Sequence, residues 1–542
     1  MSSIASSPKL NAKASSKEKA KSKSKESSVA KLLGRLDFDT MMSREPEDFD
    51  LLSQLTHMSA VATSGMSRTA LFEGTAGLSY STSKYFRQVH QVAQRLGYDY
   101  SQACEIVAET VKNDNVRNLL LHFSTALSAG EEESAFLLRE AALQRETYAK
   151  EYGRKIESLQ KWSDAYVALM VSATLVVVIS MVSMMIYPFS PISIFGLAAL
   201  MVCVTFIGAW LIFTVAPIEQ KTHSLKHRSP EQERAAKLAK VMLPAAAVAA
   251  LGAGIVLGLA AAMFVLGLLI APIGFVAFLD DRRIDARDRD IAAFIRAIGG
   301  VMSSAGITAT DALGRLNRRS LGSLEPAVRR LHIRLTNGIS PDLCWLRLAG
   351  ESGSEVVSRS IRIFWDGVRA GGDTKQVSEL SSDFALKVWL LRADRKLVAT
   401  TFSWVVVPLH MVLLGILLFI TQVVLVFNEQ IGNIQLDAAS TDLLSQAGVQ
   451  DAVLMQFGSA SFIPMFVATV AIFITAANSF APYGATGGHR LKLCLFAAVM
   501  LVMSGVTMFV VPHVVHGLFD NIASTGTAMP GSATPVPTAG GI

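Results

Sequence analysis

Charge and paired cysteines are both scarce in this sequence. Only 17% of its 542 residues are charged, whereas 51% are hydrophobic and the mean hydropathy is +0.39. A typical soluble domain has about 25% charged residues, so this composition argues against an ordinary soluble enzyme. The four cysteines are scattered and form no CxxC pair (Cys104, Cys203, Cys344, Cys494). A disulfide framework and a zinc site are therefore not expected.

Sequence motifs for enzyme chemistry are also missing. No GxxxxGK[ST], HExxH or GxSxG pattern occurs, and the Gly-rich stretch at residues 370–375 has the wrong spacing for a phosphate-binding loop. The adjacent carboxylates Asp280 and Asp281 sit in a polar run, where solvation is the default expectation. We therefore predict that the protein is not an enzyme, with no catalytic residue and no cofactor or metal.

What the chain does contain is long apolar runs. About 20 apolar residues suffice to cross a bilayer core of ~30 Å. Seven runs qualify: 165–187, 191–216, 241–258, 261–279, 401–427, 462–480 and 491–516. The third and fourth form one stretch that is too long for an ordinary span, and Gly252, Gly254 and Gly258 offer a place to turn. We interpret it as a tight helical hairpin, with a single oblique helix as the alternative.

The distribution of basic residues favours the hairpin. All 50 Lys and Arg lie in five segments: 1–30, 31–164, 217–240, 280–400 and 481–492. With seven spans and a cytoplasmic N-terminus, every one of these segments falls inside, as the positive-inside rule requires. With six spans, the twenty basic groups of 280–400 would lie outside. We therefore predict a multi-pass protein of the cell (cytoplasmic) membrane with a cytoplasmic N-terminus and an external C-terminus.

The predicted fold class is all-α, a polytopic membrane protein with about seven transmembrane helices and two repeated cytoplasmic helical-bundle domains. The expected organisation is a disordered basic arm (1–30), a first helical domain (31–164), spans 1–2 (165–216), a cytoplasmic loop (217–240), a hairpin (241–279), a second helical domain (280–400), span 5 (401–427), an external loop (428–461), spans 6–7 (462–516) and an external tail (517–542). The arm, rich in Ser and Lys, is of a kind that could touch anionic lipid headgroups or simply remain solvated.

The two cytoplasmic domains are an internal repeat. A shift of 241 residues aligns them without a gap and pairs Gly65 with Gly306, Gly97 with Gly338, and Gly130 with Gly371, among other matches. Apolar residues recur at helical spacing in both copies, and the glycines fall where helices should end. We expect five or six helices per copy.

The last helix of each copy should run on into the membrane. No proline occurs between residues 132 and 187, so one helix of about 80 Å is expected there. The matching helix from Thr374 meets Pro408, which should kink it or free a carbonyl. Beyond Pro408, His410, His513 and His516 are the ionisable side chains of the spans; we expect them to form interhelical or interfacial hydrogen bonds rather than a proton path.

Arginines gather in the second copy and are the candidate partner-binding residues: Arg315, Arg318, Arg319, Arg329, Arg330 and Arg334. Residues 280–400 carry 20 basic and 15 acidic groups, whereas residues 31–164 carry 15 basic and 19 acidic groups. Opposite net charges suit docking of the copies to each other or to an acidic partner. A solvated surface is the alternative interpretation. No aromatic residues are interleaved with these arginines, so nucleic acid is not expected as a partner.

The pattern resembles the type II secretion F domain, which defines the membrane platform proteins of type IV pili, type II secretion systems and archaella. The stretches that carry the resemblance are LGYDYSQACEIVAE (96–109), LLLHFSTALSAGEE (119–132), NGISPDLCWLRLAGES (337–352) and IRIFWDGVRAGGD (361–373). The additional hairpin and the spans after residue 427 resemble the archaeal, FlaJ-type branch of the family. A bacterial lineage with archaeal-like pili is the alternative source.

The resemblance implies a platform that couples a cytoplasmic hexameric secretion ATPase to the extrusion of pilin- or archaellin-like subunits and filament assembly, with rotation in an archaellum. The implied partners are that ATPase, those subunits and the lipid membrane, and a symmetric homodimer is a hypothesis. The runner-up is a transporter or channel with duplicated cytoplasmic regulatory domains, since repeats are common there. A third interpretation, a membrane sensor scaffold, would need a larger external domain than residues 428–461 provide.

Overall fold

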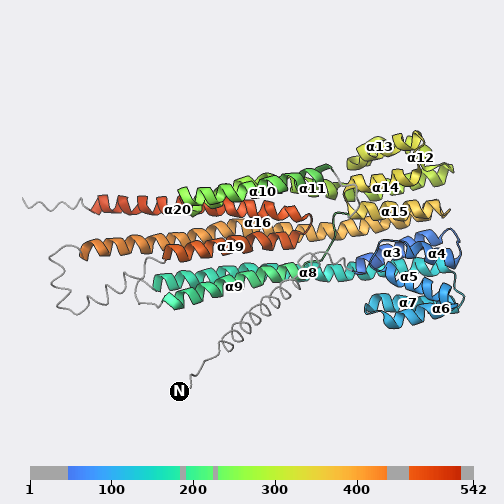
Figure 1. Ribbon diagram of the computed structural model, residues 1–542, viewed down its shortest axis with the longest axis horizontal. Coiled ribbons are helices and arrows are strands. Elements are labelled where there is room, and N and C mark those ends of the chain that lie inside the picture. Colours follow the sequence, from blue (N-terminus) through green and yellow to red (C-terminus); the bar gives the residue numbers. More distant parts are fainter. Residues whose placement is uncertain (1–46, 184–190, 224–229, 436–462, 527–542) are drawn as a thin grey trace, which may run out of the picture.

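The chain folds almost entirely into helices, as seen in a computed structural model that describes residues 47–183, 191–223, 230–435 and 463–526 (Figure 1). The predicted all-α, polytopic fold class is confirmed. Within these ranges no β-strand forms, apart from one isolated bridge between Thr222 and Ser354. The arm 1–30, the loop 428–461 beyond residue 435 and the tail after residue 526 lie outside the described residues.

The helices of the first copy are α3 (Glu47–Ala62), α4 (Arg68–Ala76), α5 (Ser83–Leu96), α6 (Tyr100–Thr110), α7 (Asp114–Ser128) and α8 (Glu133–Ser183). Next come α9 (Pro191–Val215), α10 (Pro230–Leu257) and α11 (Leu259–Ala305). The second copy continues with α12 (Ala309–Arg315), η1 (Arg318–Leu324), α13 (Glu325–Thr336), α14 (Pro341–Ser352), α15 (Glu355–Arg369) and α16 (Thr374–Gln435). The chain ends with α19 (Ile463–Thr486), η3 (Arg490–Lys492) and α20 (Leu493–Gly526).

Six helices in the described part of the chain are long and apolar enough to cross a membrane. They include parts of α8, α10, α11, α16, α19 and α20. The remaining predicted span, 191–216, corresponds to α9, whose segment Ala199–Val215 is a shorter apolar helix. In Figure 1 α9 runs beside α8.

The long apolar stretch of residues 241–279 turns back on itself at one residue. Gly258, between α10 and α11, has a φ of 87°, a conformation that favours glycine. The start of α10 and the middle of α11 both contact the end of α14. Gln232 of α10 donates to the Gly353 carbonyl (3.4 Å), and Arg287 of α11 donates to the Ser352 carbonyl (2.6 Å). The two helices are therefore an antiparallel hairpin.

The 241-residue repeat extends to the conformation of the backbone. The three repeated glycine pairs all have positive φ: 67° and 61° at Gly65 and Gly306, 72° and 74° at Gly97 and Gly338, and 72° and 85° at Gly130 and Gly371. Helices α4 to α8 map onto α12 to α16, and α3 maps onto the last part of α11. Even caps correspond, since Ser67 and Thr308 each accept from the backbone three residues on.

Two helices connect the copies to the membrane part without interruption. The 51 residues of α8 span about 77 Å and the 62 residues of α16 about 93 Å. The expected continuous helix after residue 132 is confirmed, and α16 also remains one helix through Pro408. Both copies lie at the same end of the molecule, here called the bundle end (Figure 1).

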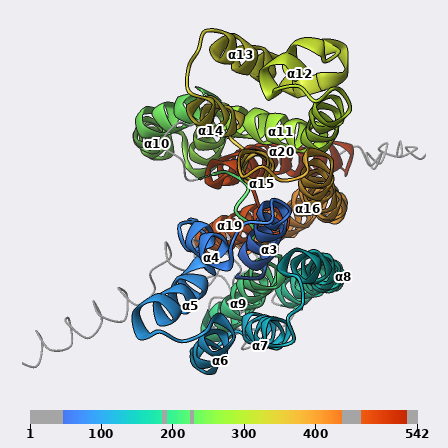
Figure 2. The same ribbon diagram turned by 90° about the vertical axis from the view of Figure 1, so that its right-hand side faces the viewer.

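Helix α3 lies between the two copies (Figure 2). Thirteen of its sixteen residues are buried. Leu51 and Leu55 belong to the core of the first copy, whereas Phe49 and Leu52 belong to a core shared with the second copy and with Tyr148 of α8. The first helix of copy one therefore joins the two bundles.

Candidate functional site

Buried ion pairs concentrate where the bundle end meets the apolar helices. We call this group the boundary joint and define it by eight side chains: Glu219, Lys221, Asp281, Asp285, Asp288, Arg392, Arg395 and Lys492. They come from the loop after α9, from α11, from α16 and from η3. The joint thus fixes four separate segments of the chain to one another.

Asp281 is bound by two lysines. Lys221 Nζ lies 2.7 Å from its Oδ1 and Lys492 Nζ lies 2.9 Å from its Oδ2, while Lys221 also pairs with Asp285. Burial by itself would raise the pKa of Asp281, but the two ammonium groups hold that pKa well below the usual range. Asp281 is therefore a buried carboxylate kept charged by its partners.

Asp288 and Arg392 form the second buried pair of the joint. Arg392 Nη1 lies 2.8 Å from Asp288 Oδ2, and Ser354 donates to the other carboxylate oxygen. Burial raises the pKa of Asp288, and Arg392 counteracts this only in part. Arg392 Nε also lies 3.4 Å from Glu219. The pair connects α16 to α11 and to the loop after α9.

Arg395, one turn further along α16, binds backbone carbonyls. It donates to Pro217 O (2.7 Å), Ala485 O (3.0 Å) and Gly484 O (3.3 Å). The last two carbonyls belong to the final turn of α19, where a cation is favoured by the helix dipole. Arg395 therefore attaches α16 to the ends of both α9 and α19.

The expectation that Asp280 and Asp281 are solvated is wrong. Their exposed fractions are 1% and 4%, and that of Asp288 is 1%. Asp281, Ile284, Asp288 and Ile291 follow each other at three- and four-residue steps, so the carboxylates lie on the same face of α11 as the apolar residues. This face packs inward, and the acids are buried because lysine and arginine side chains meet them there.

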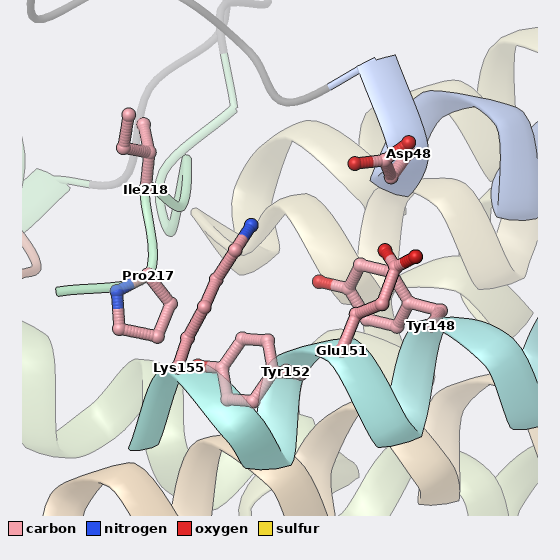
Figure 3. A pocket seen from close by; sticks show the side chains of 7 residues that line it. All are labelled: Asp48, Tyr148, Glu151, Tyr152, Lys155, Pro217 and Ile218. Atoms are coloured by element: carbon pink, nitrogen blue, oxygen red, sulfur yellow. The ribbon is translucent and has the colours of Figure 1, made fainter. Parts of the chain in front are cut away.

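The corresponding position in copy one is more open. Figure 3 shows a small pocket between α8, the start of α3 and the loop after α9. It is lined by Asp48, Tyr148, Glu151, Tyr152, Lys155, Pro217 and Ile218. In the repeat, Glu151 corresponds to Arg392 and Lys155 to Lys396, yet neither forms an ion pair within the described residues. The boundary joint is therefore built on copy two only.

A second buried polar group, the inter-copy joint, connects α3 to α15. It consists of Asp50, His57, Arg359 and Asp366. Arg359 Nη1 lies 2.6 Å from Asp50 Oδ1, with side chains 3% and 0% exposed. The guanidinium also lies 4.4 Å from the Phe49 ring centre. Burial alone would lower the pKa of Arg359, but Glu355 and Asp50 outweigh this and raise it.

Two further contacts complete the inter-copy joint. His57 Nε2 lies 2.9 Å from Asp366 Oδ2, two turns along α3 and α15 from the Arg359 pair. On the side of copy one, Asp50 accepts from the Ser81 backbone N–H (2.7 Å). Asp50 therefore ties a loop of its own copy to a helix of the other copy.

A third polar group lies among the apolar helices. His410 of α16 is fully buried, and its Nε2 lies 2.8 Å from Ser504 Oγ of α20. Asn478 of α19 donates to His410 Nδ1 (2.9 Å) and accepts from Tyr166 of α8 (2.6 Å). Thr475 lies 2.7 Å from Ser504. We call these five residues the intramembrane polar chain.

The directions of these hydrogen bonds are mutually consistent. Because Asn478 donates to Nδ1, the imidazole carries its proton on Nε2 and donates to Ser504. Thr475 donates to the Ala471 carbonyl, so Ser504 donates to Thr475. The expectation of interhelical hydrogen bonding by His410 is confirmed. His513 instead donates to the Phe509 carbonyl of its own helix (2.8 Å).

The six candidate arginines do not form one site. Arg315, Arg319 and Arg329 are exposed and make no ion pair within the described residues. Arg330 pairs with Glu351 (2.8 Å), and so does Arg334. The side chain of Arg318 lies outside the described residues. Three of the six thus remain available to a partner, and two are engaged within copy two.

A metal ion needs several ligand side chains that lie close together. In the described ranges, no group of three or more His, Cys, Asp or Glu side chains is placed to hold a metal ion. The cysteines do not change this, since Cys104 and Cys344 are buried singly. Burial raises the pKa of the Cys104 thiol to about 12. What the geometry provides is rigid connection between helices.

Comparison with known proteins finds two relatives. The chain is 23% identical over 333 residues to the flagella accessory protein J of Methanocaldococcus jannaschii, an alignment that covers 58% of each chain. It is 19% identical over 329 residues to the protein of that name from Methanococcus voltae, covering 57% of this chain and 58% of the relative. The chain thus spans less than two thirds of the length of either relative.

Two other comparisons gave nothing: no family model matches the chain, and no solved structure matches it. The two relatives nevertheless confirm the resemblance to the FlaJ-type archaellum platform proteins.

Proposed function

We propose that this chain, a relative of flagella accessory protein J, is the integral membrane platform of an archaellum or type IV pilus-like assembly machine. In this role it couples a cytoplasmic hexameric secretion ATPase to the extrusion and assembly of pilin-like subunits, and to rotation if the filament is an archaellum. The type II secretion F domain assignment, the cytoplasmic position of the bundle end and the absence of enzyme activity are parts of the same proposal.

The observation that carries the proposal is the boundary joint. Copy two is tied by buried ion pairs to the loop after α9 and to η3, and by hydrogen bonds of Arg395 to the end of α19, while its own helix α16 continues among the apolar helices. A displacement applied to copy two therefore moves several apolar helices together. A protein that only anchored a soluble domain would need one helix and no such joint.

The proposed contact for the ATPase is the exposed arginine surface of α12 and η1. Arg315 and Arg319 are exposed there, and the net positive charge of copy two suits an acidic partner. The surface lies at the bundle end, away from the apolar helices (Figure 1). A partner bound at this place would act on copy two at a distance from the boundary joint.

We expect the triple reversal Arg315→Glu, Arg318→Glu, Arg319→Glu to lower capture of the ATPase by the purified, detergent-solubilised chain at least tenfold, because attraction would become repulsion. The amount of chain in the membrane fraction should be unchanged. The matched control is Arg95→Glu, Lys112→Glu, Lys150→Glu, which reverses three exposed cations of copy one. Equal capture by both variants would place the contact elsewhere.

A transporter or channel is the competing function. The intramembrane polar chain weighs against it, because its hydrogen bonds are made to other groups of the protein and no Asp, Glu, Lys or Arg of the described residues takes part. A solute path would require polar groups directed at a water-filled cavity. Efflux or uptake activity of the purified chain in vesicles, without ATPase present, would favour the competing function.

A further inference from the structure

Exposed cations gather at the base of the α10–α11 hairpin. Arg234, Lys237 and Lys240 of α10 and Arg282 of α11 are exposed, and none of them makes an ion pair within the described residues. Arg234 and Arg282 are both 24 residues from the turn at Gly258, so in an antiparallel hairpin they lie at the same level. We call these four residues the hairpin base.

The hairpin base is at the level of the boundary joint but faces away from it. Arg282 directly follows Asp281, whose carboxylate is held between Lys221 and Lys492. The cations that face inward at this level are neutralised by acids of the protein. Those of the hairpin base are not: among the described side chains, Glu233 is the exposed acid beside them on α10, and it forms an ion pair with none of them. A negatively charged group from outside the chain would therefore be attracted to this place.

The surroundings of α10 indicate where that charge comes from. Above the hairpin base, the apolar side chains of α10 have large exposed fractions, including 70% at Val241, 71% at Val248, 69% at Leu251 and 87% at Ile255. Only 11% of its most apolar window is buried within the protein. In a bilayer these side chains contact acyl chains, and the next chemical layer along the helix is that of the headgroups.

We propose that the hairpin base binds the headgroup of an anionic phospholipid whose acyl chains cover α10. Guanidinium groups donate paired N–H bonds to phosphate oxygens, and lysine ammonium groups add compact charge. Arg234 and Arg282 can hold one phosphate from two helices, while Lys237 and Lys240 follow α10 toward the acyl region. The inference does not depend on the filament role of the protein.

The test uses the full chain purified in a neutral maltoside detergent. Native mass spectrometry and thermal unfolding are recorded with added phosphatidylglycerol, with phosphatidylcholine and with inorganic phosphate. We expect phosphatidylglycerol to remain bound and to raise the midpoint of unfolding, and phosphatidylcholine and inorganic phosphate to do neither. If inorganic phosphate raised the midpoint of unfolding as much as phosphatidylglycerol, the site would bind a free anion and not a lipid. If phosphatidylcholine raised it as much, the anionic headgroup would not be what is recognised, and the proposal would be wrong.

The decisive variant is Arg234→Gln, Lys237→Gln, Arg282→Gln, matched by Arg315→Gln, Arg319→Gln, Arg329→Gln on the bundle. Since each cation near an anionic lipid contributes on the order of 1 kcal/mol, the first variant should lose at least tenfold in apparent affinity for phosphatidylglycerol. The matched variant should lose less than twofold. Equal losses of affinity in both variants would show that only the total charge of the protein matters, and the proposed site would be wrong.

A charge-preserving variant guards against a trivial loss of folding. Arg234→Lys, Lys237→Arg, Arg282→Lys keeps three cations in place, and we expect it to retain phosphatidylglycerol within about threefold of the parent chain. Loss of lipid in this variant, with an unchanged midpoint of unfolding in lipid-free detergent, would contradict a charge-based site. A partner helix covering α10 instead of lipid would show as a second copy of the chain in the mass spectrum, with no phosphatidylglycerol bound.

Discussion

The carboxylate of Asp281 depends on both of its lysines. A buried charge is costly unless it is paired and hydrogen-bonded, and removal of one partner typically costs 3–5 kcal/mol because the other charge stays buried. Asp281 accepts from Lys221 and Lys492, and both lysine side chains are at least 87% buried. The reverse also holds: these two lysines need Asp281.

We expect Asp281→Asn to lower the free energy of unfolding by about 3–5 kcal/mol at pH 7, because two buried ammonium groups lose a charged partner. The check is the midpoint of thermal unfolding in detergent. Asp114→Asn is the control, since that carboxylate is 81% exposed and its pair with Arg117 should contribute little. A midpoint equal to that of the control would contradict a stabilising joint.

The same pair predicts a pH dependence. The pKa of Asp281 in the folded chain lies below its ordinary value of 3.8, so the unfolded chain binds the proton more readily. The stabilisation is complete above the ordinary value and is lost as the pH falls below it. The difference between parent and Asp281→Asn should therefore shrink between pH 4 and pH 3, and Asp288, whose pKa is raised, should not add to this loss.

At single residues, burial could be predicted from the sequence, but the partners of the buried groups could not. The helical spacing of Asp281, Ile284, Asp288 and Ile291 was a readable signal for burial of the acids. The matching cations were not readable, because Lys221 and Lys492 lie 60 and 211 residues away from Asp281 along the chain. The proposed partner surface had the opposite problem, since a run of arginines in sequence does not reveal that Arg330 and Arg334 are occupied by Glu351.

The long helices could be predicted well, and their lateral contacts could not. Hydropathy, the glycines and the position of prolines gave α8, the hairpin turn and the span within α16. Asn478 and Tyr166 stood in an apolar run and at the edge of one, without a periodic pattern to single them out. Only the packing of α8, α16, α19 and α20 brings them to His410.

The intramembrane polar chain should contribute measurably to the packing of the apolar helices. Asn478→Leu removes hydrogen bonds to both Tyr166 and His410 and leaves a buried hydroxyl and a ring nitrogen without partners. We expect a loss of about 1–3 kcal/mol in the free energy of unfolding in detergent, since interhelical hydrogen bonds average about 0.6 kcal/mol and unsatisfied groups cost more.

The control for this variant is Thr469→Val on the same helix, whose hydroxyl is exposed and donates only to its own backbone. It should change the midpoint of thermal unfolding by less than a degree or two. A loss as large as that of Asn478→Leu would mean that α19 is sensitive to any polar deletion, and the polar chain would have no special role.

The molecule as a whole is a duplicated structure with unequal halves. The repeat predicted both bundles, with five or six helices each, and helices α4 to α8 of the structure match α12 to α16. It could not predict the inter-copy joint, because the residues concerned differ between copies: Asp50 aligns with Ile291, and Arg359 aligns with Asn118. The contact between Asp50 and Arg359 thus lies at positions where the two copies differ in polarity.

We expect Arg359→Met to separate the copies, with a loss of about 3–5 kcal/mol in the free energy of unfolding, because Asp50 would remain buried without its cation. The control is Arg369→Met on the same helix, whose pair with Asp342 is exposed and should contribute less than about 1 kcal/mol. Adding Asp50→Asn to Arg359→Met should recover part of the loss; no recovery would mean that Arg359 acts through packing alone.

The position of α3 has a consequence for biosynthesis. The helix leaves the ribosome early, but His57 waits 309 residues for Asp366, about 15–60 s at usual rates of translation. During that time the apolar segments α8 to α11 are made while the face of α3 that carries His57 still lacks its final neighbour, α15. A chain cut short before α15 would therefore leave Asp50 and His57 without Arg359 and Asp366, their partners in the inter-copy joint.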